Sequence, residues 1–300
     1  MDPIAKENIL SDLLSGRLDK FSCLYDANNT TVLEHNKYPN LIIKISNKDI
    51  SSAEIQSKIL QTLPSGSNNI GRILDVQTLQ LDNKEKTVEL IVKMKGYSKQ
   101  AYTDSDILNV IKQTKILHES INQKRHEYIE QLPPLDMLFS NIINNSPSES
   151  LRKIAAEIQN DKAYEQFLDR ENQTIIIADM VYENILFDKE SVSFIDLDPL
   201  IQGPKNLQLS ILLTSNILVQ QEIFDHLSVE LIQQYFQVWE KDRMTRVDLI
   251  ALTIFPLLIL AMKQVNIDEL DPKTNSLYYK LKTVLFMIMR QLNNDNEKQL

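Results

Sequence analysis

The sequence predicts an α+β protein of two lobes, a small β-rich N-terminal lobe and a larger helical C-terminal lobe. Short apolar segments separated by turn-forming residues fill the first 95 positions, and apolar residues at helical spacing dominate from position 104 onward. The composition changes near Lys95-Gly96, between the two patterns. We therefore expect an N-terminal domain of residues 1–95 and a C-terminal domain of residues 96–300.

The N-terminal lobe is expected to hold five strands and two helices. Apolar residues at helical spacing predict a first helix over residues 4–17, and Ser51-Ser52 predicts the N-cap of a second. Asn-rich and charged turns separate the strand-like segments. These segments are FSCLYDA, TTVLEH, NLIIKIS, RILDVQTLQLD and TVELIVKMK.

The C-terminal lobe is expected to be helical around one short β region. Helical spacing is clear in SDILNVIKQTKILHESI and extends over residues 126–145 and 149–169. The β region consists of TIIIADM, NILFD and VSFIDLD, and the last two segments predict a hairpin. Long helices follow from Leu207. The apolar run Leu249–Met262 contains Pro256 and is too short to span a bilayer, so we expect a buried, kinked helix.

Composition disfavours several classes of partner and of location. A net charge of −9 repels phosphate backbones and anionic lipids, so we expect neither nucleic acid nor membrane as a partner. The single cysteine, Cys23, forms no disulfide within the chain and belongs to no zinc-binding spacing. MDPIAKENIL lacks the basic and apolar regions of a signal peptide. We therefore expect a cytoplasmic protein, either monomer or dimer.

Polar residues around the predicted hairpin indicate phosphoryl transfer. Asp179 ends an apolar strand, and Asn184 follows it in the pattern D-x-x-x-x-N. The return strand ends in Asp196, with Asp198 two residues later. In a hairpin, the start of the first strand and the end of the second lie at one edge, so Asn184 and Asp196 can converge on a magnesium ion. Asp179 would orient a hydroxyl nucleophile. Each residue alone is also common as a turn or capping residue.

The run ADMVYENILFDKESVSFIDLDP resembles the catalytic loop and metal-binding strand of the aminoglycoside phosphotransferase and choline kinase group of the protein-kinase-like fold. The resemblance implies that Asp179 is the catalytic base and that Asn184 and Asp196 bind magnesium. Asp198 matches the second acidic residue that the group often has. It also implies that the N-terminal lobe binds the nucleotide and that the C-terminal lobe carries the catalytic loop and the acceptor site.

Three positions depart from the pattern of this group. Ile177 and Val181 stand where the group has histidines, and Gln208 stands where it has a structural aspartate. We expect these changes to weaken the hydrogen bonding around the catalytic loop while the base and metal positions stay intact. His118 matches a histidine that is more often packed than catalytic.

The same resemblance implies a nucleotide site in the N-terminal lobe. Lys44 in LIIKIS matches the lysine that contacts the nucleotide phosphates, and Glu54 in the following helix would pair with it. Asn28 and Asn29 would form the loop over the phosphates, without a glycine. Backbone groups from Lys93 to Lys95 would meet the adenine. Lys44 as an ordinary strand lysine and Glu54 as a solvated helix residue are the structural alternatives.

The sequence thus favours a phosphotransferase that uses ATP (or GTP) and Mg2+ to phosphorylate a hydroxyl of a small molecule. Glu127, Glu130 and Asp136 would suit a cationic, aminoglycoside- or choline-like acceptor, or else form a solvated helix face. The alternative from another class is a kinase-fold nucleotide-binding or regulatory module with little or no catalysis. A kinase acting on protein side chains is disfavoured, because no extended activation segment separates Asp196 from Leu207.

Overall fold

The chain forms two compact units in the computed structural model. Unit 1 comprises Met1–Tyr97 and Leu186–Asp196, and unit 2 comprises Ser98–Ile185 and Leu197–Leu300. The structure describes residues 3–27, 30–63, 70–81, 83–99, 102–169, 173–189, 191–214, 229–239, 245–270 and 277–297. Residues 186–196, which we assigned from sequence to the C-terminal domain, group with the N-terminal one.

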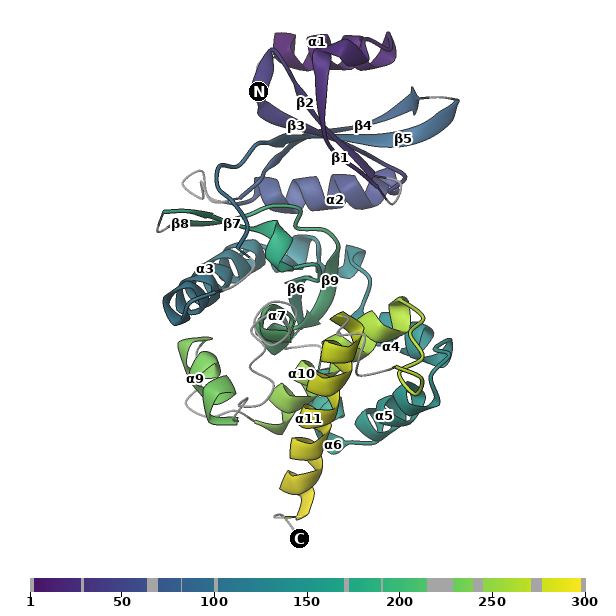
Figure 1. The fold of residues 1–300 in the computed structure, drawn as a ribbon, viewed down its shortest axis with the longest axis vertical. Coiled ribbons are helices and arrows are strands. Elements are labelled where there is room, and N and C mark those ends of the chain that lie inside the picture. The colour runs from purple at the N-terminus through teal and green to yellow at the C-terminus, as the bar shows by residue number, and fades with distance from the viewer. Residues whose placement is uncertain are drawn as a thin grey trace. The chain divides into compact units, whose positions relative to one another are not determined.

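Unit 1 is built on a five-stranded antiparallel sheet in the order β1-β2-β3-β5-β4 (Figure 1). One helix, α1, covers one face of this sheet, and α2 lies on the other (Figure 1). The elements are α1 (Pro3–Leu14), η1 (Leu18–Lys20), β1 (Phe21–Ala27), β2 (Thr30–His35), β3 (Tyr38–Ser46), α2 (Ile50–Gln61), β4 (Ile73–Leu81) and β5 (Lys84–Val92).

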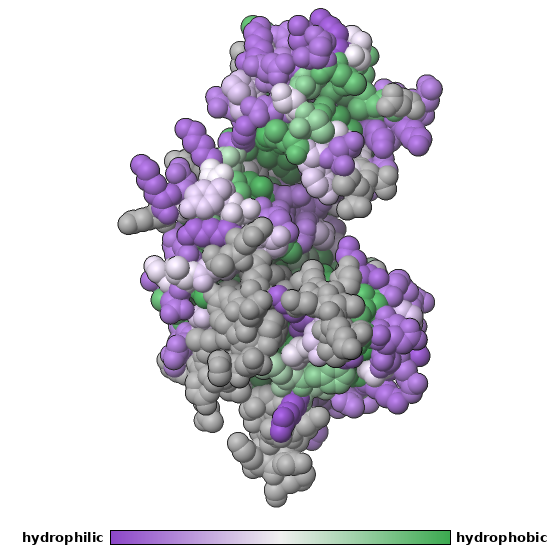
Figure 2. Space-filling view, viewed as in Figure 1, coloured by the Kyte–Doolittle hydropathy of each residue, from purple (hydrophilic) through white to green (hydrophobic). Residues whose placement is uncertain are grey.

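Strand alternation decides which residues meet each helix. Ile43 of β3 and Val88 and Leu90 of β5 pack with Ile9 and Leu13 of α1 in a buried apolar cluster. The residues between them on the two strands necessarily face the α2 side. Figure 2 shows hydrophobic residues gathered over the strands of unit 1, whereas α1 presents mostly hydrophilic ones.

The N-cap of helix α2 lies two residues before Ser51, the first of the serines expected to cap it. The Asp49 carboxylate caps the helix by accepting a hydrogen bond of 3.1 Å from the backbone N–H of Ser52. Asp49 is a better N-cap than serine here because its ionised carboxylate also interacts favourably with the positive end of the helix dipole. The expected N-cap at Ser51-Ser52 is therefore wrong by two residues.

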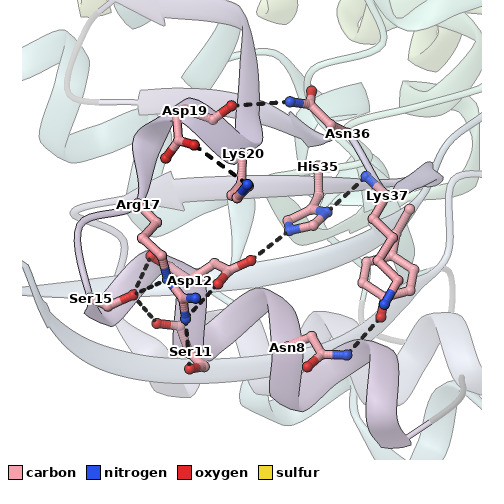
Figure 3. A network of polar contacts seen from close by, with 11 residues as sticks. Asn8, Ser11, Asp12, Ser15, Arg17, Asp19, Lys20, His35, Asn36 and Lys37 are labelled. Atoms are coloured by element: carbon pink, nitrogen blue, oxygen red, sulfur yellow. Dashed lines mark hydrogen bonds and ion pairs between the residues drawn. The ribbon is translucent and has the colours of Figure 1, made fainter.

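A polar network joins α1 to the β2–β3 turn (Figure 3). The buried His35 ring has Nε2 3.1 Å from Asp12 Oδ2, and its Nδ1 accepts from the Lys37 backbone N–H at 3.1 Å. Arg17 pairs with the same Asp12 at 2.6 Å. The hydrogen bond from His35 is the largest cause that holds the pKa of Asp12 below its usual value, and the charge of Arg17 adds to it.

This depressed pKa predicts a pH dependence of stability. Because the folded-state pKa of Asp12 lies below the unfolded one, its stabilisation is present above about pH 4 and is lost as the pH falls through the folded pKa. Denaturation of the wild type and of Asp12→Asn between pH 6 and pH 3 measures the effect. The difference in unfolding free energy should shrink towards pH 3, and a constant difference would contradict the linkage. Asp19→Asn, at an exposed site of the same network, serves as the control.

The hairpin of β7 (Ile185–Asp188) and β8 (Ser191–Phe194) is attached to unit 1 by backbone hydrogen bonds. Tyr97 and Phe187 exchange two, at 3.1 and 2.9 Å, and Gly71 N–H donates to Phe194 O at 2.9 Å. Gly96 makes the first contact possible, because its φ is +125° and a Cβ there would lie 2.8 Å from Phe187 O. These bonds explain why residues 186–196 belong to unit 1.

Gly96→Ala should therefore destabilise unit 1 by about 2–3 kcal/mol, since alanine rarely adopts this backbone conformation and its methyl group would displace Phe187. Gly16→Ala is the matched control. Its φ is +68° with open space around it, so about 1 kcal/mol of backbone strain is expected there. Chemical denaturation monitored by circular dichroism would compare the two. Equal losses would show that the contact with Phe187 is unimportant.

Unit 2 consists of helices around the two-stranded antiparallel sheet of β6 and β9. Its elements are α3 (Asp104–Asn122), η2 (Arg125–Glu127), η3 (Ile129–Gln131), α4 (Leu135–Asn144), α5 (Glu149–Gln159), α6 (Lys162–Phe167), β6 (Gln173–Ile177), η5 (Tyr182–Asn184), β9 (Leu200–Pro204), α7 (Lys205–Leu212), α9 (Val229–Trp239), α10 (Arg246–Met262) and α11 (Leu277–Glu297). Helices α3 and α7 both pack against β6. Helix α10, which contains Pro256, is almost entirely buried. No helix in the described part of the chain is long and apolar enough to cross a membrane.

Two regions of unit 2 differ from the expected elements. The helix expected over residues 149–169 is divided, because Asp161 caps the start of α6 through the N–H of Ala163 and pairs with Arg246 at the start of α10. Strand β9 was not expected at all. Its sequence, Leu-Ile-Gln-Gly-Pro, contains two strand-breaking residues and becomes a strand through pairing with β6.

Candidate active site

Strand β6 leads into the predicted catalytic loop, and all five of its residues are buried. One edge of β6 pairs with β9. On the other edge the amide side chain of Asn122 donates to Ile175 O at 3.1 Å and accepts from Ile175 N–H at 2.7 Å. Arg125 donates to Gln173 O at 2.9 Å. Side chains thus take the place of a third strand.

Gln208 completes this edge directly before the loop. Its side-chain oxygen accepts from Ile177 N–H at 2.8 Å, and its amide nitrogen donates to Ile177 O at 3.2 Å. Gln208 is fully buried, as is the Ile177 side chain. We expected the departures at these positions to weaken the hydrogen bonding around the loop. At Gln208, however, the neutral amide satisfies both backbone groups of Ile177, which an aspartate could not do because it has no donor when ionised.

Gln208→Met is predicted to lower the free energy of unfolding by about 2–4 kcal/mol, because methionine keeps the volume but leaves the N–H and C=O of Ile177 buried without these partners. Gln131→Met, at an exposed glutamine, provides the comparison. Urea denaturation of both variants measures the difference. A Gln208→Met protein as stable as the control would exclude a supporting role for this side chain.

Asn184 closes the predicted catalytic loop. Its amide nitrogen donates to Asp179 O at 2.9 Å across the single 3-10 turn of η5. The amide oxygen of Asn184 is thereby the atom suited to bind a cation. Asp179 is half-buried in the same loop. The bond explains the D-x-x-x-x-N spacing, because the asparagine holds the backbone of the residue that begins the loop.

Val181 and His118 are two further positions that the sequence pattern singled out. Val181 is half-buried between Asp179 and η5. His118 is 2% exposed, with Nε2 3.2 Å from Thr174 Oγ1 and its ring centroid 5.8 Å from that of Trp239. His118 therefore lies in the core of unit 2, beside the middle of β6.

Unit 1 brings together Lys44 of β3 and Asp196, which follows β8. Lys44 Nζ lies 2.5 Å from Asp196 Oδ1, and the lysine side chain is 13% exposed while the aspartate is 43% exposed. Asp196 has a φ of +49°, a left-handed conformation that aspartate adopts more readily than most residues. In this structure the Asp196 carboxylate is thus paired with the Lys44 ammonium.

The other predicted site residues are placed as follows. Glu54 is exposed on α2. Lys93 is exposed, its ammonium 2.6 Å from Glu34, and its backbone N–H donates to Asn40 O at 2.9 Å. Lys95 is exposed, and Asp198 is half-buried before a cis bond to Pro199. Asn28 and Asn29 lie outside the described residues.

Sequence reasoning passed over two charged residues near these groups. Glu89 of β5 is 2% exposed and lies directly opposite Lys44 in the β3–β5 register. Glu89 is the single carboxylate in the otherwise apolar strand segment VELIV, and this pattern could have identified it from sequence. Glu183, next to Asn184, hydrogen-bonds Tyr182 and thereby raises the pKa of that phenol.

A cavity of about 640 Å3 lies in unit 2 near the start of β6. Glu130 and Asp136 line it, together with Arg125 and Gln173. Gln173 is the first residue of β6, whereas Asp179 follows its last, so the two are separated by roughly 20 Å of extended chain. Gln202 of β9, which pairs with Ile175 in the middle of β6, also lines the cavity. Among the described residues, no three histidine, cysteine or acidic side chains are grouped to hold a metal ion.

The sequence and the structure were compared with those of known proteins. No protein-family model matches the sequence, and no curated protein sequence matches it significantly. The solved structure of amicoumacin kinase hAmiN, in complex with AMP-PNP, Ca2+ and Ami, is similar with a TM-score of 0.60 and 13% identity, over 98% of this chain and 94% of that one.

Two further structures of the same kind are similar. A choline/ethanolamine kinase family protein from Mesorhizobium loti has a TM-score of 0.60 at 10% identity, over 96% of this chain and 98% of that one. Aminoglycoside phosphotransferase APH(3'')-Id from Streptomyces rimosus has a TM-score of 0.59 at 14% identity, over 84% of this chain and 98% of that one. The chain therefore has the two-lobed protein-kinase-like fold of these small-molecule kinases, as the sequence predicted.

Proposed function

We propose that this protein is a phosphotransferase that transfers the γ-phosphoryl group of ATP, or of GTP, to a hydroxyl of a small molecule. The observation that supports this most is the Lys44–Asp196 ion pair, in a chain with the fold of small-molecule kinases. It joins the strand lysine and the hairpin aspartate to which the sequence pattern assigns phosphate and metal binding.

Unit 1 would bind the nucleotide. Lys44 would hold the α- and β-phosphates, and Asn28-Asn29 would cover them. The Lys93 N–H is engaged by Asn40 O, so the adenine would meet the backbone groups that follow it, up to Lys95. Glu54 is the expected partner of Lys44, although the structure pairs this lysine with Asp196.

Asn184 and Asp196 would hold magnesium, with Asp198 as a second acidic residue. Their amide and carboxylate oxygens are the hard ligands that Mg2+ prefers, alongside phosphate oxygens and water. Asp196 would exchange the Lys44 ammonium for the divalent ion when a nucleotide is present. Bound magnesium supplies neutralisation of the phosphate charge.

Asp179 would orient the acceptor hydroxyl and take its proton. The acceptor oxygen then forms a bond to the γ-phosphorus, and the bond from that phosphorus to the β,γ-bridging oxygen breaks, leaving a nucleoside diphosphate. We propose a cationic acceptor, because the similar structures include kinases of aminoglycosides and of choline or ethanolamine. The net charge of −9 is favourable for attracting such a molecule.

A nucleotide-binding or regulatory module with little or no catalysis is the second candidate. The observation that favours it is that the buried Ile177 and Gln208, which carry no charge, stand where the resembled pattern has a histidine and an aspartate. For either candidate we place the protein in the cytoplasm, as a monomer or a dimer.

Nucleotide with magnesium should raise the melting temperature, by roughly 5 °C at a hundredfold excess over Kd, because it binds only the folded state. Asp196→Asn should remove the magnesium dependence of this shift. Asp188→Asn, in the exposed turn of the same hairpin, should leave it intact. No shift with millimolar ATP or GTP would refute the phosphotransferase.

Turnover separates the two candidates. Nucleotide consumption should be screened with amino sugars, amino alcohols and nucleosides as acceptors. Asp179→Asn is expected to retain nucleotide binding and to lose at least about a hundredfold in kcat. A rate unchanged in this variant would refute the role of Asp179, and binding without turnover on any acceptor would favour the regulatory module.

A further inference from the structure

A buried carboxylate lies beside Lys44 in the sheet of unit 1. Glu89 of β5 is 2% exposed and is the residue directly opposite Lys44 in the antiparallel β3–β5 register. Residues opposite one another on such a pair lie on the same face, with Cβ atoms about 4.5–5.5 Å apart. Glu89 therefore shares with Lys44 the face of the sheet that α2 covers.

The burial of Glu89 requires a positive partner, because an isolated carboxylate in the protein interior is costly. Lys44 is adjacent in the sheet and is itself 13% exposed. A second lysine, Lys48, precedes α2 and donates to the buried Gln56 at 2.6 Å. Strand pairing places Lys44 directly opposite Glu89.

Glu54 differs from Glu89 in its exposure and in its attachment to Lys44. It is exposed on α2, so water solvates its charge. Glu89 is fixed to Lys44 by the backbone hydrogen bonds between two central strands of the five-stranded sheet. A partner on the neighbouring strand holds the lysine with less freedom than a partner on a separate helix.

We propose that Glu89 is the positioning residue for Lys44, in the role that the sequence pattern suggested for Glu54. This inference rests on the proposed function of Lys44 as the phosphate-binding lysine. Lys44 then has two carboxylate partners of different character. Glu89 is buried and permanent, whereas Asp196 is 43% exposed and can exchange Lys44 for a metal ion.

A stability cycle tests the pairing without any ligand. Lys44→Met should lower the unfolding midpoint by roughly 5–10 °C, since it leaves the Glu89 carboxylate buried without its lysine. Glu89→Gln in the Lys44→Met background should recover most of that loss. The same cycle with Lys48→Met should show no such recovery. Additive losses for Lys44 and Glu89, or a larger recovery with Lys48, would overturn the proposal.

Nucleotide binding tests the positioning role. Glu89→Gln should raise the Kd of ADP roughly tenfold, because Lys44 is no longer held toward the phosphates, and should leave the Kd of adenosine unchanged. Glu89→Asp should restore part of the ADP affinity. Glu85→Gln, at an exposed position of the same strand, is the matched control. A purely structural role for Glu89 would change both affinities or neither, and that outcome would refute the proposal.

The two experiments separate the possible failures. If the wild-type protein does not bind ADP, the proposed function fails and the stability cycle still decides whether Glu89 and Lys44 are paired. If ADP binds and Glu54→Gln, rather than Glu89→Gln, selectively weakens it, the proposed function stands and the inference about Glu89 is wrong.

Discussion

The buried strand β6 is the constraint on which the candidate catalytic loop depends. A strand buried on both faces must satisfy every backbone group within the protein. Strand β9 satisfies one edge, and the side chains of Asn122, Arg125 and Gln208 satisfy the other. The loop that contains Asp179 therefore follows a strand whose backbone groups are hydrogen-bonded along both edges.

A second constraint is the register between β3 and β5 in unit 1. It places Ile43, Val88 and Leu90 in the core against α1, and it places Lys44 and Glu89 together on the opposite face. A slip by one residue would exchange the two sets, burying the charges against α1 and exposing the apolar residues. The same hydrophobic packing that stabilises the sheet thus fixes the position of the phosphate-binding candidate.

The β7–β8 hairpin shows how a segment of the helical half of the sequence comes to carry a residue of the N-terminal unit. Its bonds to Gly71 and Tyr97 hold Asp196 beside Lys44, 152 residues away in the chain. Gly96 permits this attachment because only glycine fits its backbone conformation so close to Phe187. The sequence analysis placed residues 186–196 in the C-terminal domain because of their position in the chain. Backbone pairing, rather than sequence position, decides which unit this segment joins.

The sequence by itself determined the fold class, the five strands of unit 1 and the D-x-x-x-x-N loop, because these depend on local periodicity and on residue spacing. Only the tertiary structure showed strand β9, the cap at Asp49, the bonds of Gln208 to Ile177, and the pairing of Lys44 with Asp196. Each of these joins residues whose partner is chosen by three-dimensional packing. The role of Glu89 shows the difference most clearly, since its burial and its neighbour depend on which strands pair and in which register.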